Sequence, residues 1–375
     1  MIWAVVIGAL IILTVLWEAF ETVVLPRRVT RRFRLTVVFY RTTWGIWKFI
    51  GRRIRKTSRR ESLLSFYGPL SLLFLFIFWA GGLIFGFALL YYSEARVDVA
   101  TAKFTTALYL SGTTLFTLGI GDVVPHAAVG RFLVVVESGL GFGFLALVLS
   151  YLPVIYQAFS RREVNIVLLD ARAGSPPTAA ELLRRHVGPS GIESLMQLLR
   201  DWERSSAEIL ESHISYPAVA YFRSQHNNES WLSALSAMLD VTALLLSSTV
   251  DADLRQARLT FAMCRHTVVD LAQLFRTPPH NVAVDRLPAA EFDRLLAQLE
   301  TTGFQIREPQ AAEKKLSELR KMYEPYLAVL SRYLFMEVPP WILAKEVTDN
   351  WRTSAWGRIS GFAVTTATEV DDHSD

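Results

Sequence analysis

Three long apolar runs dominate the amino-terminal half of the chain. The first covers residues 1–25 and is interrupted only by Glu18 and Glu21 near its end. The second covers residues 63–92 and the third residues 129–159. Because about twenty consecutive apolar residues are enough for a helix to cross a bilayer, the pattern predicts an all-α membrane protein with three spanning helices.

The carboxyl-terminal half shows a different pattern, in which apolar stripes at helical spacing alternate with polar connections. Residues 195–202 and 254–275 carry apolar side chains at three- and four-residue intervals, which is typical of helices with one buried face. Residues 231–246 are almost wholly apolar but too short for a span, so we expect a buried core helix there. We therefore predict an all-helical domain over residues 160–368 and a disordered acidic tail over 369–375.

Positive charge is concentrated in one segment. Between Arg27 and Arg60 the chain carries thirteen lysines or arginines and no acidic residue, whereas residues 93–128 carry only Arg96 and Lys103. Loops rich in Lys and Arg remain on the cytoplasmic side. The distribution predicts a multi-pass protein of the plasma (cell inner) membrane, with the amino terminus outside and the carboxyl-terminal half in the cytoplasm. We expect no nucleic-acid partner, because a basic run between apolar spans is typical of a membrane protein's inner loop.

Within this basic segment, residues 26–62, the pattern indicates a helix lying along the membrane surface. Basic residues recur over 34–59 at intervals of three, four or seven, and apolar residues such as Phe39 and Phe49 occupy the opposite side. We expect one cytoplasmic interfacial helix that binds membrane lipid, with anionic inner-leaflet lipid held along 27–60. A voltage sensor is the alternative, and it is disfavoured because the arginines lie outside any apolar span.

The segment between the second and third spans carries the candidate chemistry. Residues 117–122 read Thr-Leu-Gly-Ile-Gly-Asp and follow a short, threonine-rich apolar stretch over 102–116. Glycines at alternate positions, Gly119 and Gly121, permit backbone dihedrals that a Cβ forbids. Successive carbonyl oxygens can then face one axis and replace the water shell of an ion.

This loop resembles the pore signature of the potassium channel family. The resemblance covers residues 107–125 without a gap and includes Ser111, Thr117 and Pro125. It implies a two-transmembrane-type pore module with a single pore loop per chain, here preceded by an extra amino-terminal transmembrane helix. The implied pore domain, 63–159, consists of an outer helix (63–92), a pore helix (102–116), a filter (117–122) and an inner helix (129–159).

The resemblance also assigns roles to individual residues. Potassium ions in the filter are the expected ligands, and no organic cofactor is expected. The carbonyl groups implied to coordinate potassium belong to Thr117, Leu118, Gly119 and Ile120. The hydroxyl group of Thr117 adds a further oxygen at the inner mouth, Gly121 completes the filter, and Asp122 ends it on the outer side.

The chain departs from the family at three positions around the filter. Leu110 stands where the family has an aromatic residue, Phe116 where it has threonine, and Ile120 where it has tyrosine. We expect packing to replace the family's hydrogen-bonded cuff, which leaves potassium selectivity in place and its strength open. The residues expected to support the filter are Tyr109, Leu110, Thr113 and Glu137, the last through a bond to Thr113 or Ser111. A position of Glu137 near the wet outer mouth with no special role is the alternative.

The third span supplies the expected gate. Gly141 lies near the usual hinge of the inner helix, with small-residue packing between helices as the alternative. Pro153 can kink the same helix by removing a backbone hydrogen bond. Val148 and Leu152 would then line an apolar constriction.

One pore loop cannot enclose an ion, so the function requires a homotetramer. The prediction is a potassium-selective channel gated by its inner helices and regulated through its helical domain. A weakly selective monovalent cation channel and a membrane signalling scaffold with a non-conducting pore are the alternatives. No nucleophile–base arrangement indicates an enzyme, the histidines show no metal-ligand spacing, and the single cysteine, Cys264, reads as a small core residue.

Overall fold

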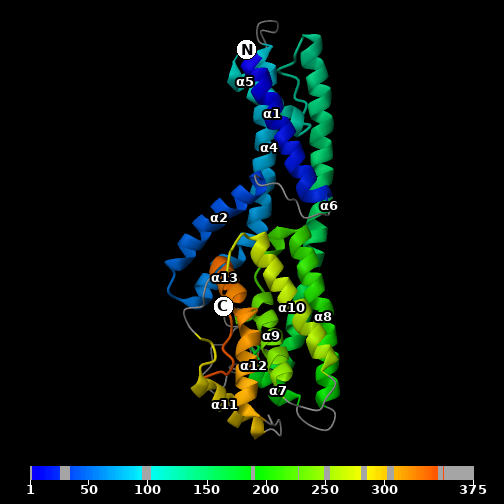
Figure 1. Cartoon of the computed structure of the whole chain (residues 1–375). Helices are drawn as coiled ribbons and strands as arrows, with labels where there is room; N and C mark the ends of the chain where they lie inside the picture. The colour runs from blue at the N-terminus through cyan, green and yellow to red at the C-terminus, as the bar shows by residue number, and fades with distance from the viewer. Residues whose placement is uncertain are drawn as a thin grey trace, which may run out of the picture. The chain divides into compact units, whose positions relative to one another are not determined.

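The computed structural model describes residues 2–25, 34–94, 103–186, 191–226, 228–248, 254–279, 285–301, 308–344 and 349. Every regular element among these residues is helical (Figure 1), and three helical stretches are long and apolar enough to cross a membrane. They are Ile2–Val24, Thr57–Ser93 and Ala128–Ala173. The prediction of an all-α membrane protein is confirmed.

The chain divides into two compact units, and each is described by itself. The membrane unit consists of Met1–Arg53 and Phe66–Gln157, and the helical unit of Ile54–Ser65 and Ala158–Asp375. Part of the basic segment (26–33), the start of the expected pore helix and the tail 369–375 lie outside the described residues.

In the membrane unit, the first helix packs along the second span. Helix α1 (Ile2–Ala19) continues into a π-helical turn, η1 (Phe20–Val24), and lies against α4 (Tyr67–Ser93). Two glycines allow the close approach: a Cβ on Gly8 would lie 2.7 Å from the carbonyl oxygen of Gly86. Small residues that bring two backbones together are a common way to pack helices within a bilayer.

The basic segment forms two helices where the sequence predicted one interfacial helix. Helix α2 (Leu35–Arg52) belongs to the membrane unit, and α3 (Thr57–Ser65) belongs to the helical unit. The break follows Gly51, and a glycine costs helix stability because it loses the most conformational freedom. The closely spaced positive charges that come next repel one another, which also disfavours a continuous helix.

A buried carboxylate ties the start of α2 to the end of α1. Glu18 Oε2 accepts hydrogen bonds from the backbone N–H of Thr36 at 3.0 Å and from the Thr36 hydroxyl group at 2.8 Å. The first N–H groups of a helix have no partner within the helix. Glu18, which the sequence showed only as an interruption of an apolar run, therefore caps α2.

The remaining helices of the pore segment are α5 (Phe104–Leu115) and α6 (Ala128–Ala173). Three predicted bounds differ: the outer helix begins at Tyr67 instead of residue 63, the pore helix is slightly shorter than 102–116, and the inner helix continues to Ala173 instead of ending at residue 159. The arginines after residue 159 end the apolar run without ending the helix. The end of an apolar run therefore does not mark the end of this helix.

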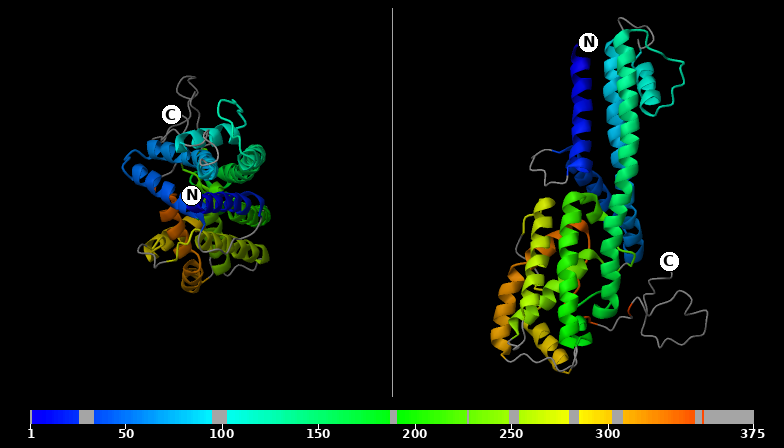
Figure 2. Two further views of the ribbon diagram at one scale, coloured as in Figure 1. Left: turned by 90° about the horizontal axis from the view of Figure 1, so that it is seen from above. Right: turned by 90° about the vertical axis from the view of Figure 1, so that its right-hand side faces the viewer.

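The helical unit is built around one buried helix, α9 (Trp231–Ser247), and every residue of α9 is buried as the sequence predicted. A capping box starts it, since Ser230 Oγ accepts from the N–H of Ser233 at 3.0 Å while Ser233 Oγ accepts from the N–H of Ser230 at 2.8 Å. Seen from a second direction (Figure 2), the longer helices of this unit lie side by side. The surrounding elements are α7 (Ala179–Arg185), α8 (Gly191–Ser215), η3 (Pro217–Tyr221), α10 (Arg255–Leu274), α11 (Ala289–Glu300), α12 (Pro309–Lys321) and α13 (Glu324–Leu334).

Candidate functional site: the pore loop of the membrane unit

The candidate filter begins in the turn that ends the pore helix α5. The N–H of Thr117 donates to the carbonyl oxygen of Thr114 at 2.9 Å, and the N–H of Leu118 donates to that of Thr113 at 2.8 Å. Thr117 has φ +56°, so this is the pairing of a Schellman motif with its left-handed residue supplied by threonine. The motif fixes the direction in which the chain leaves the helix.

From that turn onward, the described backbone places every second residue in the left-handed region. The φ angles are +56° at Thr117, +56° at Gly119 and +81° at Gly121. Glycine adopts this conformation at no steric cost, whereas any other residue is disfavoured. The spacing of the two glycines is therefore a requirement of the backbone.

The outer end of the loop is held by Asp122. Its Oδ1 accepts a hydrogen bond from the N–H of Val123 at 3.1 Å, and its carboxylate group interacts with the Tyr109 side chain of the pore helix. Within one chain, the side chains of Leu118 and Ile120 are 63% and 61% exposed. In a single copy of the chain, the side chains of the loop are therefore not covered by other residues. The expected packing of Ile120 with Leu110 remains a prediction.

A buried cluster behind the pore helix joins three helices. The Ser111 hydroxyl group of α5 contacts Glu137 Oε1 of α6, and the Tyr91 hydroxyl group of α4 donates to Glu137 Oε2 at 2.8 Å. Ser111 Oγ also lies 2.9 Å from the carbonyl oxygen of Ile84 in α4. Of the two partners that the sequence suggested for Glu137, the structure selects Ser111, because Thr113 Oγ1 donates to the carbonyl oxygen of Leu110 at 2.9 Å.

Sequence reasoning missed the part of this cluster that α4 supplies. Tyr91 and Ile84 lie in an apolar span with no motif around them, and Tyr91 is 46 positions from Glu137. The available signal was general: a hydroxyl group buried among apolar residues requires a hydrogen-bond partner.

The structure gives Gly141 a packing role. A Cβ at this position would lie 1.9 Å from the carbonyl oxygen of Leu115, the last residue of the pore helix. Helix α6 runs through Gly141 and Pro153 without interruption, Val148 and Leu152 are half-buried, and Pro153 is exposed. A gate or hinge at these positions remains a prediction.

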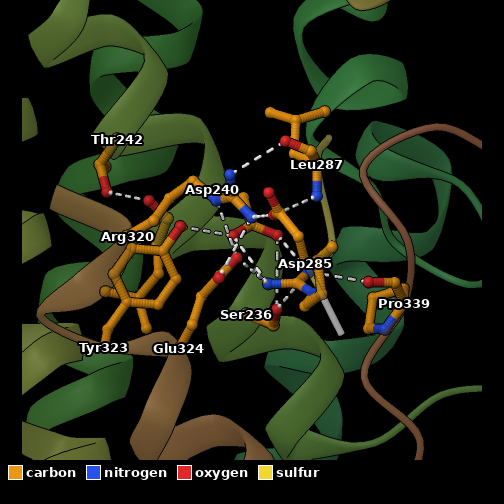
Figure 3. A network of polar contacts seen from close by, with 11 residues as sticks. Ser236, Asp240, Thr242, Asp285, Leu287, Arg320, Tyr323, Glu324 and Pro339 are labelled. Carbon is orange, nitrogen blue, oxygen red and sulfur yellow. Dashed lines mark hydrogen bonds and ion pairs between the residues drawn. The ribbon is translucent and has the colours of Figure 1, made fainter. Parts of the chain in front are cut away.

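A second polar cluster lies in the core of the helical unit (Figure 3), centred on Asp240 in the middle of α9. Asp240 Oδ2 accepts from Arg286 Nη2 at 2.6 Å, and Oδ1 accepts from the Tyr323 hydroxyl group at 2.7 Å. Arg286 Nη2 also donates to the carbonyl oxygen of Pro339 at 2.8 Å. Burial opposes the charge on Arg286, but the carboxylate group of Asp240 outweighs it and the net effect raises the pKa of Arg286.

The same cluster extends to a second arginine. Arg320 Nε donates to Glu324 Oε1 at 3.0 Å, Arg320 also pairs with Asp285, and Arg286 Nη1 reaches Glu324 Oε1 at 3.3 Å. Burial raises the pKa of Glu324 although both arginines oppose this. At Asp285 burial also acts to raise the pKa, but the hydrogen bonds from Arg320 and from the N–H of Leu287, together with the charge of Arg320, lower it on balance. The buried acids face guanidinium groups, so the cluster is a structural network of paired charges.

Among the described residues, no group of three His, Cys, Asp or Glu side chains is placed to hold a metal ion. Cys264 is fully buried, its Sγ lies 3.1 Å from Ser206 Oγ, and burial raises the pKa of its thiol group to about 12. These observations agree with the interpretation of Cys264 as a core residue.

Comparison with known proteins supports the pore interpretation. A curated relative described as an uncharacterized membrane protein, YdjJ of Bacillus subtilis (strain 168), is 20% identical over 280 residues, which is 72% of this chain and 80% of the relative. No solved structure matches the chain significantly. Residues 72–157 match the family model described as an ion channel, so this segment of the membrane unit is similar to an ion-channel domain, which is consistent with a potassium channel family.

Proposed function

We propose that the chain is a homotetrameric potassium-selective channel of the plasma membrane, with its filter at residues 117–122. The observation that carries the proposal is the left-handed backbone at Thr117, Gly119 and Gly121, directly after the pore helix and inside the ion-channel segment. When left-handed residues alternate with residues of negative φ, successive carbonyl groups point toward the same side. Four copies around an axis would present rings of carbonyl oxygens that replace the hydration shell of potassium.

The pore helix contributes to cation binding in this proposal. Its carboxyl-terminal end carries a partial negative charge, although the carbonyl groups of Thr113 and Thr114 already accept amide protons from the loop. Four such ends stabilise a cation at the inner mouth, where loss of water is most costly. Asp122, held against Tyr109, supplies a ring of negative charge at the outer mouth.

Weak selectivity among monovalent cations is the second candidate, and the apolar residues Leu110 and Ile120 favour it. In one chain the described hydrogen bonds of the cluster behind the pore helix are made by Tyr91, Ser111 and Glu137, and Ile120 has no polar group with which to join them. Reversal potentials under bi-ionic potassium and sodium separate the two candidates. Equal permeability contradicts potassium selectivity while leaving a channel in place.

The decisive experiment is potassium flux from liposomes that contain the purified full chain. Gly119→Ala is expected to abolish flux, because alanine is strained at φ +56° regardless of the space around it. Gly112→Ala is the matched control, since a Cβ at Gly112 in the pore helix meets nothing within 4 Å. A wild-type protein without flux, or flux unchanged by Gly119→Ala, contradicts conduction through this loop and favours a membrane scaffold.

We also propose that the amino terminus is outside and that α2 lies on the inner leaflet. The support is the exposed apolar side of α2, which includes Val38, Ile46 and Phe49, together with the basic residues of the same segment. Added anionic lipid is expected to increase flux or tetramer stability, and charge-reversed variants of Arg41 and Lys48 are expected to lose that increase. Equal behaviour in purely zwitterionic liposomes contradicts the lipid contact.

A further inference from the structure

The helical unit has an unusual apolar surface on α6. Three of the exposed large hydrophobic side chains of this unit lie within five consecutive residues, where Val164 is 56%, Val167 50% and Leu168 54% exposed. Its other exposed large hydrophobic side chains, among the described residues, are on separate elements and are Ile192, Leu259 and Met322. Scattered apolar residues are normal on a surface, whereas a contiguous group indicates a contact.

The opposite side of this stretch is fixed in the core of the helical unit. Arg162, Ile166 and Leu169 are buried. The guanidinium group of Arg162 donates to the carbonyl oxygen of Val219 at 3.0 Å and to that of Phe222 at 2.8 Å. Because these contacts hold the rotation of α6, the exposed side chains cannot turn inward.

The exposed side has the spacing of a helix-to-helix seam. Val164, Val167 and Ala171 recur at intervals of three and four, with Leu168 beside them, and all four are exposed. Apolar residues that recur every three and four positions are what packed parallel helices require. We call Val164, Val167, Leu168 and Ala171 the α6 stripe.

The hydrocarbon core of the membrane does not reach the α6 stripe. From Ala128, where α6 begins, to Val164 is about 54 Å along the helix at about 1.5 Å per residue. Even at the largest usual tilt, about 40°, this rise exceeds the roughly 30 Å of the hydrocarbon core. The exposed arginines Arg161 and Arg172 border the stripe, as expected for a helix in water.

We propose that the α6 stripe is covered by the α6 helices of other copies of this chain, so that the tetramer seam continues beyond the membrane. The inference rests on the proposed function, because a channel with one pore loop per chain must assemble from four copies. Rotational symmetry places the same residue of each α6 at the same height, so an apolar stripe meets an apolar stripe. The hydrogen bonds of Arg162 to Val219 and Phe222 then fix the rest of the helical unit to the helix that forms the seam. A movement of the helical unit would therefore move α6 as well.

Cysteine cross-linking of the full chain in liposomes tests this inference. The native Cys264 is fully buried and its thiol group has a raised pKa, so it leaves little background. Val164→Cys and Val167→Cys are treated with a short bis-maleimide and compared with Ala207→Cys, an exposed alanine on α8. Covalent dimers are expected to form at 164 and 167 faster by on the order of a hundredfold or more, because assembled neighbours have millimolar effective concentrations.

Two outcomes separate this inference from the proposed function. Potassium flux without preferential cross-linking at 164 and 167 overturns the seam and leaves the channel standing. Cross-linking at these positions without flux supports the seam and contradicts conduction. As a second variant, Leu168→Glu is expected to lower the tetramer fraction measured by mass photometry, and Ala207→Glu is its control; equal tetramer fractions overturn the seam as well.

Discussion

The two units solve the burial of polar groups in opposite ways. Behind the pore helix, one carboxyl group, Glu137, is surrounded by hydroxyl groups and a backbone carbonyl group. In the helical unit, Asp240 and Glu324 lie against Arg286 and Arg320. Both clusters are buried, but only the second contains charges of both signs.

The protons available at Glu137 explain the difference. The Ser111 hydroxyl group has one proton and lies close to two acceptors, the carbonyl oxygen of Ile84 and Glu137 Oε1. Both contacts are hydrogen bonds when Glu137 carries a proton and donates it to Ser111, which then donates to Ile84. The Tyr91 hydroxyl group completes this chain at the other carboxyl oxygen. A neutral acid suits a bilayer, where an unpaired charge is costly.

The first prediction concerns Asp240, where the largest effect is expected. Asp240→Ala leaves Arg286 charged, buried and without its main partner. Removing one partner of a buried pair lowers stability by about 3–5 kcal/mol. Hydrogen exchange of α9 in the full chain measures the opening free energy, and Glu193→Ala on α8 is the control for loss of an acidic residue. A change below about 1 kcal/mol is typical of a surface pair and contradicts the network.

The second prediction tests the neutral state of Glu137. Glutamine reproduces the chain of bonds, because its amide group donates to Ser111 and its oxygen accepts from Tyr91. Glu137→Gln is therefore expected to retain the ion selectivity and the thermal stability of the wild type. Glu137→Ala leaves the buried Tyr91 hydroxyl group without its acceptor, while Ser111 can still donate to the carbonyl oxygen of Ile84; an unsatisfied buried hydroxyl group costs about 1–3 kcal/mol. The measurements are bi-ionic reversal potentials and tetramer melting.

The comparison of the glutamine and alanine variants separates charge from hydrogen bonding. If Glu137→Gln behaves like Glu137→Ala, then the carboxylate charge is required and the neutral chain is wrong. Ser111→Ala removes the link to the pore helix and is expected to resemble Glu137→Ala in selectivity. Unchanged reversal potentials in both variants show that the cluster has no role in positioning the filter.

The third prediction concerns His213 in the helical unit, which is buried beside the positive charge of Arg162 and is expected to be neutral. His213 Nε2 lies 3.4 Å from Arg162 Nη1, its Nδ1 lies 3.2 Å from Ser212 Oγ, and its ring packs on Trp231. Burial, and then the positive charge of Arg162, lowers the pKa of His213 well below its ordinary value. The folded state therefore holds the neutral imidazole.

The sign of the pH dependence follows from this shift. Below the unfolded pKa of about 6.5, the unfolded chain binds a proton at His213 that the folded chain does not bind. Stability is complete above that value and falls by about 1.4 kcal/mol per pH unit on acidification, until the lower folded pKa is reached. Hydrogen exchange of α8 between pH 7 and 5 measures the slope. His213→Gln is expected to remove this contribution, and an unchanged slope contradicts a buried neutral histidine.

The two clusters also show what the sequence predicts and what it does not. Apolar runs and stripes predicted the spans and the buried helix α9, because these depend on neighbours within one helix. The filter was predicted from Gly119 and Gly121, since their backbone requirement is local. The partner of Asp240 was not predicted, because Arg286 lies 46 positions away in a connection without regular pattern. Such pairings depend on how helices meet in three dimensions.

The smallest expected effects come from a matched pair of tyrosines, and they test the comparison most directly. Tyr91→Phe removes the donor to Glu137 Oε2, and Tyr323→Phe removes a donor to Asp240 Oδ1, which Arg286 Nη1 still contacts at 3.2 Å. A hydrogen bond to a neutral group contributes about 0.5–1.5 kcal/mol and one to a charged group about 1.5–3 kcal/mol.

If Glu137 is neutral, Tyr91→Phe costs no more stability than Tyr323→Phe, although the carboxyl group in the membrane unit has fewer remaining donors. If Glu137 is charged, the order reverses, because the carboxylate loses one of its few donors while Asp240 retains an arginine. Tetramer melting for Tyr91→Phe and hydrogen exchange of α9 for Tyr323→Phe give the two free energies, and a clearly larger loss for Tyr91→Phe contradicts the neutral acid.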